Sequence, residues 1–119
     1  MRIAMQRNFQ PDPRSALMVR RFVEEAIPRA PNLDDIVLAA SELASNVIQH
    51  AKTPFKVRIL AHDDLIRLEV SDGSSIIPAI EDLIESYRGL RMIESVSQRW
   101  GAETTETGKT IWAEFTNTP

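Results

Sequence analysis

Two polar side chains, Glu42 and Asn46, stand four residues apart in a segment that is otherwise rich in apolar residues. In an α-helix this spacing puts both on one face, one turn apart and within about 40° of each other. The amide oxygen of Asn46 could there bind a hard cation such as Mg²⁺, and the carboxylate of Glu42 could deprotonate a hydroxyl group. The solvated face of an amphipathic helix explains the pair as well, so neither residue decides the matter alone.

A third candidate, Asp72, ends a segment in which apolar and polar residues alternate. It is in phase with Ile66, Leu68 and Val70, so its carboxylate should point toward the buried side and needs a partner there. It could accept a hydrogen bond from the exocyclic amine of adenine, with Gly73 letting the backbone approach the base. The carbonyl that guanine presents at that position would be repelled. An ordinary Asp-Gly turn is the alternative.

Two glycine-containing segments could hold phosphate groups. Gly89 precedes an apolar pattern of helical spacing, and the free N–H groups at a helix start bind anions, although a simple turn explains a single glycine too. The segment Gly108-Lys109-Thr110 resembles the end of a P-loop. However, Glu103 stands where the first glycine of that motif belongs, and two expected strands flank the segment. We therefore reject a P-loop.

The elements that must position these residues follow from hydrophobic spacing. Residues 2–9 have strand character, and a Pro11-Asp12-Pro13 cluster ends that strand and opens a helix over 14–27 with Asp12 as its cap. A second helix opens at Asn32, with acidic residues in its first turn, and continues to Ala51. This second helix carries Glu42 and Asn46.

The second half of the chain changes period. Alternating apolar residues predict a hairpin over 55–61 and 66–71, followed by a loop with a short helix over 74–88. A helical stripe from Leu90 to Trp100 stops at Gly101, and two strands over 102–105 and 110–115 follow. Because all the helices can cover one face of the strands, we expect an α+β fold. It should be a two-layer α/β sandwich with a mixed, mostly antiparallel sheet.

Composition bounds the function. The 119 residues fit a single domain spanning 1–119, with 43% hydrophobic and 26% charged residues. The net charge of −3 leaves no positive field for a phosphate backbone, so direct nucleic-acid binding is not expected. The absence of cysteine excludes disulfides and thiolate zinc sites. No long apolar stretch or signal-peptide core occurs, so we expect a cytoplasmic protein that does not enter a membrane.

Taken in order, these segments resemble the histidine-kinase-like ATPase family with the GHKL, or Bergerat, fold, and specifically its anti-sigma factor serine kinase branch. Its E-L-x-x-N-x-x-x-H-A box is present as ELASNVIQHA over 42–51, and its opening helix is similar to 13–27. The adenine-binding segment is similar to LEVSDGS over 68–74, and the later glycine box to Arg88-Gly89-Leu90. The closing motif is similar to Trp100-Gly101 and to GKTIWA over 108–113.

This resemblance implies a role for each matching residue. Glu42 would be the catalytic general base, Asn46 the Mg²⁺ ligand and Asp72 the adenine acceptor. The other residues implied to bind the cofactor ATP are Gly73, Arg88, Gly89, Leu90 and Thr110. The family further implies an ATP-dependent serine kinase that binds a sigma factor and phosphorylates an anti-sigma antagonist (an anti-anti-sigma protein), and its members generally form homodimers.

Three positions depart from the family pattern and keep a second function open. Ser74 stands where many relatives have a second glycine, Tyr87 replaces the first glycine of the later box, and Arg91 occupies a position that is usually apolar or small. These changes bear on phosphate binding, because they remove permissive backbone positions. The segment 76–87, which corresponds to a mobile lid, also carries an apolar face suited to docking. The alternative is therefore a non-catalytic partner-binding module of the same fold.

Overall fold

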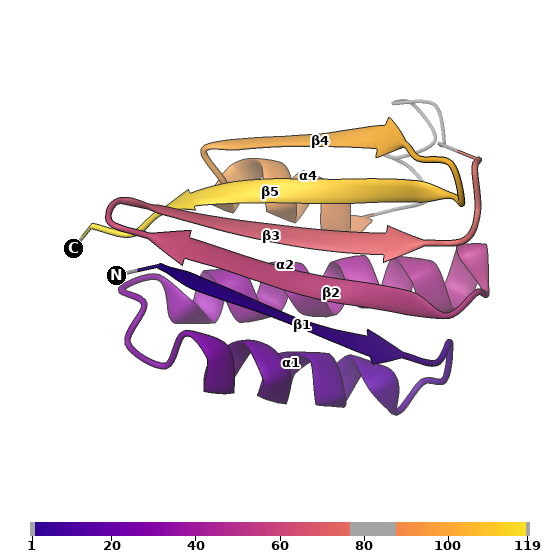
Figure 1. The fold of residues 1–119 in the computed structure, drawn as a ribbon, viewed down its shortest axis with the longest axis horizontal. Helices are drawn as coiled ribbons and strands as arrows, with labels where there is room; N and C mark the ends of the chain where they lie inside the picture. The colour runs from indigo at the N-terminus through magenta and orange to yellow at the C-terminus, as the bar shows by residue number, and fades with distance from the viewer. Residues whose placement is uncertain (1, 77–87, 119) are drawn as a thin grey trace.

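The computed structural model describes residues 2–76 and 88–118, and for residues 88–90 it describes the backbone alone. Strands and helices alternate along the chain in small groups, and Figure 1 shows how they are arranged. The elements are β1 (Ile3–Phe9), α1 (Ser15–Ala26), α2 (Leu33–Asn46), the π-helix η1 (Val47–Ala51), β2 (Phe55–His62), β3 (Leu65–Asp72), α4 (Arg88–Val96), β4 (Arg99–Thr104) and β5 (Lys109–Thr116).

The strands form one sheet in the order β1-β2-β3-β5-β4, and every pair of neighbouring strands among the described residues is antiparallel. In Figure 1 the helices α2 and α4 lie behind the sheet, α1 lies below β1, and no helix of the described residues lies in front of the strands. The expected α+β two-layer sandwich with helices on one face is therefore confirmed. No helix in the described part of the chain is long and apolar enough to cross a membrane.

The core lies between the sheet and the helices. Strand residues alternate between the two faces, so that Val57, Ile59 and Leu68 are completely buried while their sequence neighbours are not. Helix residues such as Phe22 and Leu43 meet them from the other layer. Each such side chain contributes roughly 1.5–3 kcal/mol to stability by leaving water.

Both helix starts differ in detail from the expected caps. Helix α1 begins at Ser15, and the carboxylate of Asp12 accepts hydrogen bonds from the backbone N–H and the guanidinium of Arg14 in the turn before it. These bonds hold the pKa of Asp12 below its ordinary value. Helix α2 begins after Asn32 as expected, but the Asn32 side chain donates to the carbonyl oxygen of Thr116 at 3.0 Å instead of capping the helix. This bond ties the helix start to the end of β5.

The second expected helix changes from an α-helix to a π-helix in its last turn. The regular α-helix stops at Asn46, and the last turn is the π-helix η1, closed by the N–H of Lys52 donating to the carbonyl of Val47 at 2.7 Å. Lys52 has a φ of 56°, the left-handed conformation that reverses the chain into β2. A π turn widens a helix locally, and such turns are frequent at functional sites.

The expected helix over Leu90–Trp100 is wrong at its C-terminal end. Helix α4 ends at Val96, and both Trp100 and Gly101 belong to β4. The cause is pairing with β5: the N–H of Gln98 donates to the carbonyl of Glu114, and the ladder continues with Trp100 opposite Ala113. Helical spacing of apolar residues could not reveal this non-local pairing.

The start of α4 and the starts of the last two strands also differ from the prediction. Gly89 is the second residue of α4, whereas it was expected to precede the helix. The strands β4 and β5 start earlier than expected, at Arg99 and Lys109. The expected short helix and apolar lid face over 77–87 lie outside the described residues.

Candidate functional site

The predicted site residues gather at one end of the sandwich. At the right-hand end of Figure 1 lie the C-terminal part of α2, the end of β3, the beginning of β5 and the beginning of α4. A hydrogen bond of 2.8 Å from the N–H of Gly73 to the hydroxyl of Thr53 ties the end of β3 to the segment after η1. The fold therefore brings Glu42, Asn46 and Asp72 to the same end of the molecule.

Asp72 lies on the helix-covered face, as its phase predicts, and its side chain is only 2% exposed. The partner that a buried carboxylate requires is Lys109, the first residue of β5, which stands directly opposite it in the strand ladder. The Nζ atom of Lys109 lies 3.1 Å from Oδ1 and 3.0 Å from Oδ2 of Asp72, and the N–H of Ser74 donates to Oδ1 at 2.8 Å. Lys109 is itself buried, with 8% of its side chain exposed.

Lys109 is the residue that sequence reasoning missed. The signal was present, because Lys109 precedes Ile111, Ala113 and Phe115 in steps of two, and these three residues are buried. The same alternation that placed Asp72 inward places Lys109 inward too. The similarity of Gly108-Lys109-Thr110 to a P-loop and the expected strand start at residue 110 leave Lys109 outside the strand. Its alternation with the buried residues of β5 is therefore not considered in the prediction.

Gly108 brings the β4–β5 turn against the site. A Cβ atom at this position would lie 1.8 Å from the carbonyl oxygen of Asp72 and 2.8 Å from the Cα of Gly73. Both neighbours are backbone atoms, which cannot swing aside as a side chain can. Only glycine permits this approach, and the approach sets the position of Lys109 beside Asp72.

Asn46 and Glu42 are both partly buried on α2. The amide nitrogen of Asn46 is fully covered and has no hydrogen-bond partner within the described residues. An unpartnered buried polar group costs about 1–3 kcal/mol, and folded proteins rarely retain one without a reason. Its place one turn beyond Glu42 is therefore suited to a ligand-binding role.

The remaining predicted residues divide into two groups. The backbone of residues 88–90 forms the start of α4, where first-turn N–H groups lack partners within the helix and can face an anion. Thr110 lies on the open face of the sheet, where its hydroxyl and that of Ser71 are 2.7 Å apart. The sheet therefore separates the Thr110 side chain from the carboxylate of Asp72.

A hollow of about 610 Å³ also lies at this end, but on the open face. Its polar lining includes Lys56, Arg58, Glu69, Ser71 and Thr110. Asp72 also lines this hollow, but its carboxylate lies on the opposite, helix-covered face of the sheet. The hollow is thus distinct from the site that Glu42, Asn46 and Asp72 define.

Comparisons with known proteins agree with this geometry. A solved structure of the RsbU and RsbW domains of Rv1364c from Mycobacterium tuberculosis has a similar fold, with a TM-score of 0.75 and 20% sequence identity. The match covers 98% of this chain and 33% of that one, so the chain spans about a third of the larger protein. No curated protein sequence matches the chain significantly.

The family comparison is more direct. The sequence profile of the histidine kinase-like ATPase domain matches residues 9–115, which is almost the whole chain. The matched region contains α1, α2, the β2–β3 hairpin and most of β5, and with them every predicted site residue. Such a domain implies nucleotide binding. The resemblance inferred from the motifs is confirmed: the chain belongs to the histidine kinase-like ATPase domain family.

Proposed function

We propose that this domain binds ATP with Mg²⁺ and acts as an anti-sigma regulatory factor that phosphorylates a serine of an antagonist protein. One observation carries the proposal: the end of the sandwich that holds Glu42 and Asn46 on α2 also holds the buried carboxylate of Asp72. ATP-dependent phosphoryl transfer requires a group that accepts the proton of the hydroxyl, a ligand for the metal ion and a site that binds the nucleobase. Glu42, Asn46 and Asp72 offer these three groups in that order.

The side chains present are compatible with the nucleotide and its metal. The buried amide nitrogen of Asn46 has no partner among the described residues and can donate to a phosphate oxygen, and α4 begins nearby with N–H groups suited to phosphate. Within the described ranges, His, Asp and Glu side chains form no cluster of three that could hold a metal. The amide oxygen of Asn46 would hold the metal ion together with phosphate oxygens and water, a ligand set that is typical of Mg²⁺.

Each residue then has a distinct task. When bound, ATP with Mg²⁺ supplies a phosphoryl group whose charge is partly neutralised. Glu42 accepts the proton of the attacking serine hydroxyl, and Asn46 orients the metal. Asp72 would accept a hydrogen bond from the adenine amine, Gly73 would let the backbone approach the base, and the backbone of residues 88–90 would bind phosphate. Thr110 is left out of this set because its hydroxyl lies on the open face.

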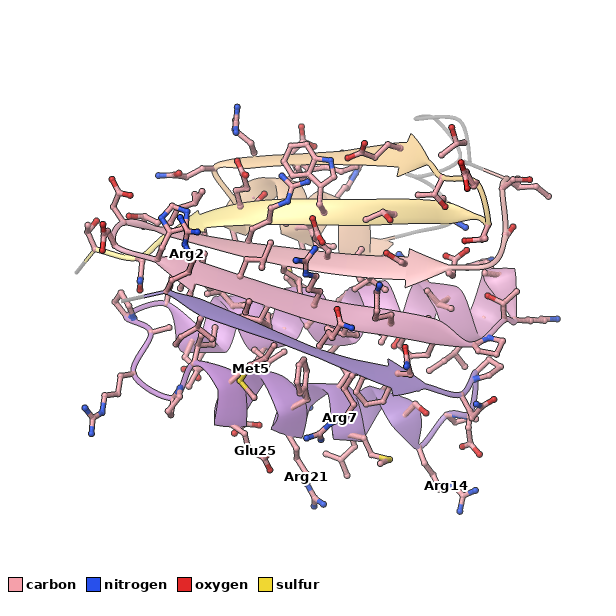
Figure 2. The ribbon with its side chains drawn as sticks, in the orientation of Figure 1. Arg2, Met5, Arg7, Arg14, Arg21 and Glu25 are labelled. Atoms are coloured by element: carbon pink, nitrogen blue, oxygen red, sulfur yellow. The ribbon has the colours of Figure 1, made fainter. Side chains whose placement is uncertain are left out.

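The partners we propose are a sigma factor, its antagonist and a second copy of this chain. A surface suited to protein binding lies along α1, which exposes Leu17 and Met18 to about half of their area. Figure 2 shows Arg7, Arg14 and Arg21 along β1 and α1. Because Arg7 already pairs with Glu25 and Arg14 with Asp12, the exposed apolar side chains are what this surface offers, and they favour a partner with apolar groups.

A non-catalytic binding module is the second candidate, and a specific observation favours it. Lys109 already holds both carboxylate oxygens of Asp72. Ser74, whose N–H also bonds Asp72, adds a side chain where many relatives have glycine. Such a protein would keep the fold and the partner surface but bind no nucleotide.

Calorimetric titration of the protein with ATP, with and without Mg²⁺, separates the two functions. We expect binding of ATP that strengthens with Mg²⁺, and Asn46→Ala should abolish that strengthening because it removes the metal ligand. Glu42→Ala should keep ATP binding and lower phosphoryl transfer. Asn8→Ala, which changes an exposed residue of the same type on β1, is the matched control. A folded wild-type protein that releases no heat with ATP would support the binding module instead.

A further inference from the structure

The pairing of Lys109 with Asp72 bears on how the domain would read a nucleobase. Both side chains are more than nine-tenths buried, at 8% and 2% exposure. The ammonium of Lys109 contacts both carboxylate oxygens at 3.1 and 3.0 Å, and its only other polar contact among the described residues is the carbonyl oxygen of Ser74 at 3.4 Å. The last contact is near the outer limit for a hydrogen bond.

Counting bonds shows what the pair can still offer. A carboxylate has about four lone-pair directions, and the two hydrogen bonds that Asp72 accepts, from Lys109 and from the N–H of Ser74, both go to Oδ1, while Oδ2 contacts the ammonium only as an ion pair. An ammonium has three N–H donors, and the one directed at the carbonyl of Ser74 is weakly held. The pair therefore retains one acceptor and one donor that can be redirected, close together and screened from water.

We propose that Lys109 is a specificity-determining residue that reads the base jointly with Asp72, by donating a hydrogen bond to N1 of adenine. This inference rests on the proposed function, because it places adenine at Asp72. The edge of adenine presents its amino group, a donor, next to N1, an acceptor. The carboxylate of Asp72 can accept from the amino group, and the ammonium of Lys109 can donate to N1.

The same pair rejects 6-oxopurines at both positions. Hypoxanthine and guanine present a carbonyl oxygen at position 6 and an N–H at position 1, so the oxygen would face the carboxylate and the N–H would face the ammonium. A buried site built for hydrogen bonding discriminates strongly, because the wrong ligand leaves its polar groups unpaired. Lys109 thus discriminates against 6-oxopurines at position 1, in addition to the discrimination by Asp72 at position 6.

Nucleotide analogues test this inference on the wild-type chain without any substitution. 1-Deaza-ATP keeps the amino group of ATP but replaces N1 by a C–H, so it cannot accept the bond from Lys109. In calorimetric titrations with Mg²⁺ we expect 1-deaza-ATP to bind at least tenfold more weakly than ATP, as loss of a hydrogen bond to a charged group predicts. ITP should bind more weakly still.

A variant then assigns the effect to Lys109. In Lys109→Met the two adenine nucleotides should bind equally, because the donor is gone. Lys56→Met, the same substitution on the open face of β2, should behave as wild type. Since Lys109→Met leaves a buried carboxylate unpaired, Asp72→Asn with Lys109→Met provides a second protein without the donor and without that charge, and it too should lose the preference for N1.

The outcomes that would overturn the inference are specific. Equal binding of ATP and 1-deaza-ATP to wild type removes Lys109 from base recognition while leaving the proposed function intact. Tighter ATP binding by Lys109→Met than by wild type makes Lys109 an obstruction instead of a reader. If neither nucleotide binds the folded wild-type protein, the proposed function and this inference fail together.

Discussion

Two groups of ion pairs lie on opposite faces of the same two strands, β3 and β5, and they are built differently. On the helix face Asp72 and Lys109 form a single buried pair at the end of the strands. On the open face, toward the C-terminal end of β5, Glu114 accepts hydrogen bonds from both Arg67 and Arg99. On the open face Glu114 and Arg67 each have more than one partner of opposite charge, whereas among the described residues Asp72 contacts one cation.

The open-face network continues across the sheet. Arg67 also donates to Glu69 at 2.8 Å, Glu69 pairs with Arg58 at 3.6 Å, and the guanidinium of Arg67 lies 4.3 Å from the centre of the Trp112 ring. This network covers part of the face of the sheet that no helix covers, and its contribution to stability is divided among many contacts. The comparison indicates that the network serves the stability of the sheet and that the lone pair serves the site.

The largest effect should come from breaking the lone pair. Lys109→Met removes the only cation that contacts Asp72 within the described residues, and uncompensated buried charges typically cost 3–5 kcal/mol. We expect the free energy of unfolding, measured by urea titration at neutral pH, to fall by about that amount. Asp72→Asn together with Lys109→Met should recover most of the loss. A loss no larger than that of Lys56→Met would mean that the pair is not buried in solution.

The next effect concerns the glycine that positions the pair. Gly108→Ala places a Cβ atom 1.8 Å from a backbone oxygen, so the β4–β5 turn must move, at a cost of about 3 kcal/mol. Gly101→Ala on the open face is the matched control, because the atoms nearest to its Cβ would belong to the Trp112 side chain, the first at 2.7 Å. That side chain can move, so the cost should be about 1 kcal/mol. Equal losses of unfolding free energy would contradict this distinction.

These residues also show what could be predicted from sequence. Period-two alternation predicted the β2–β3 hairpin and the inward direction of Asp72, because a strand with one covered face must alternate. The same rule would have placed Lys109. Trp100 was assigned to a helix because its apolar spacing fits α4 as well as β4, and only pairing with β5 decides between them. The buried amide of Asn46 depends on packing from several elements, which no local pattern records.

A smaller, pH-dependent effect is expected at Glu114. Burial alone would raise its pKa, but hydrogen bonds from Arg99 and Arg67 lower it below the ordinary value of 4.5. Because the folded-state pKa is depressed, the ionised carboxylate stabilises the fold above about pH 4.5, and this contribution is lost as pH falls through the folded pKa. Glu114→Gln should therefore cost about 1–2 kcal/mol at pH 7, and the difference from wild type should shrink below pH 4.5.

Glu103 provides the control for that experiment. It lies on the same face and reaches Arg67 only at 3.8 Å, with 62% of its side chain exposed. Glu103→Gln should leave the unfolding free energy and its pH dependence close to those of wild type. If Glu103→Gln and Glu114→Gln gave the same pH profile, the stabilisation would come from net charge and not from the bonds to Glu114.

The smallest effect should follow from removing one arm of the network. Arg99 is 71% exposed, and Glu114 keeps its bond to Arg67 when Arg99 is lost. Arg99→Ala should therefore cost about 0.5 kcal/mol, and less in high salt because exposed charges are screened. Arg67→Ala should cost more, since Arg67 is 24% exposed, also bonds Glu69 and covers the Trp112 ring. In the double variant Glu114 is left without a partner, so the combined loss should exceed the sum of the single losses. Simple additivity in urea unfolding would show that the two arginines do not substitute for each other, and the contrast with the single pair at Asp72 would then disappear.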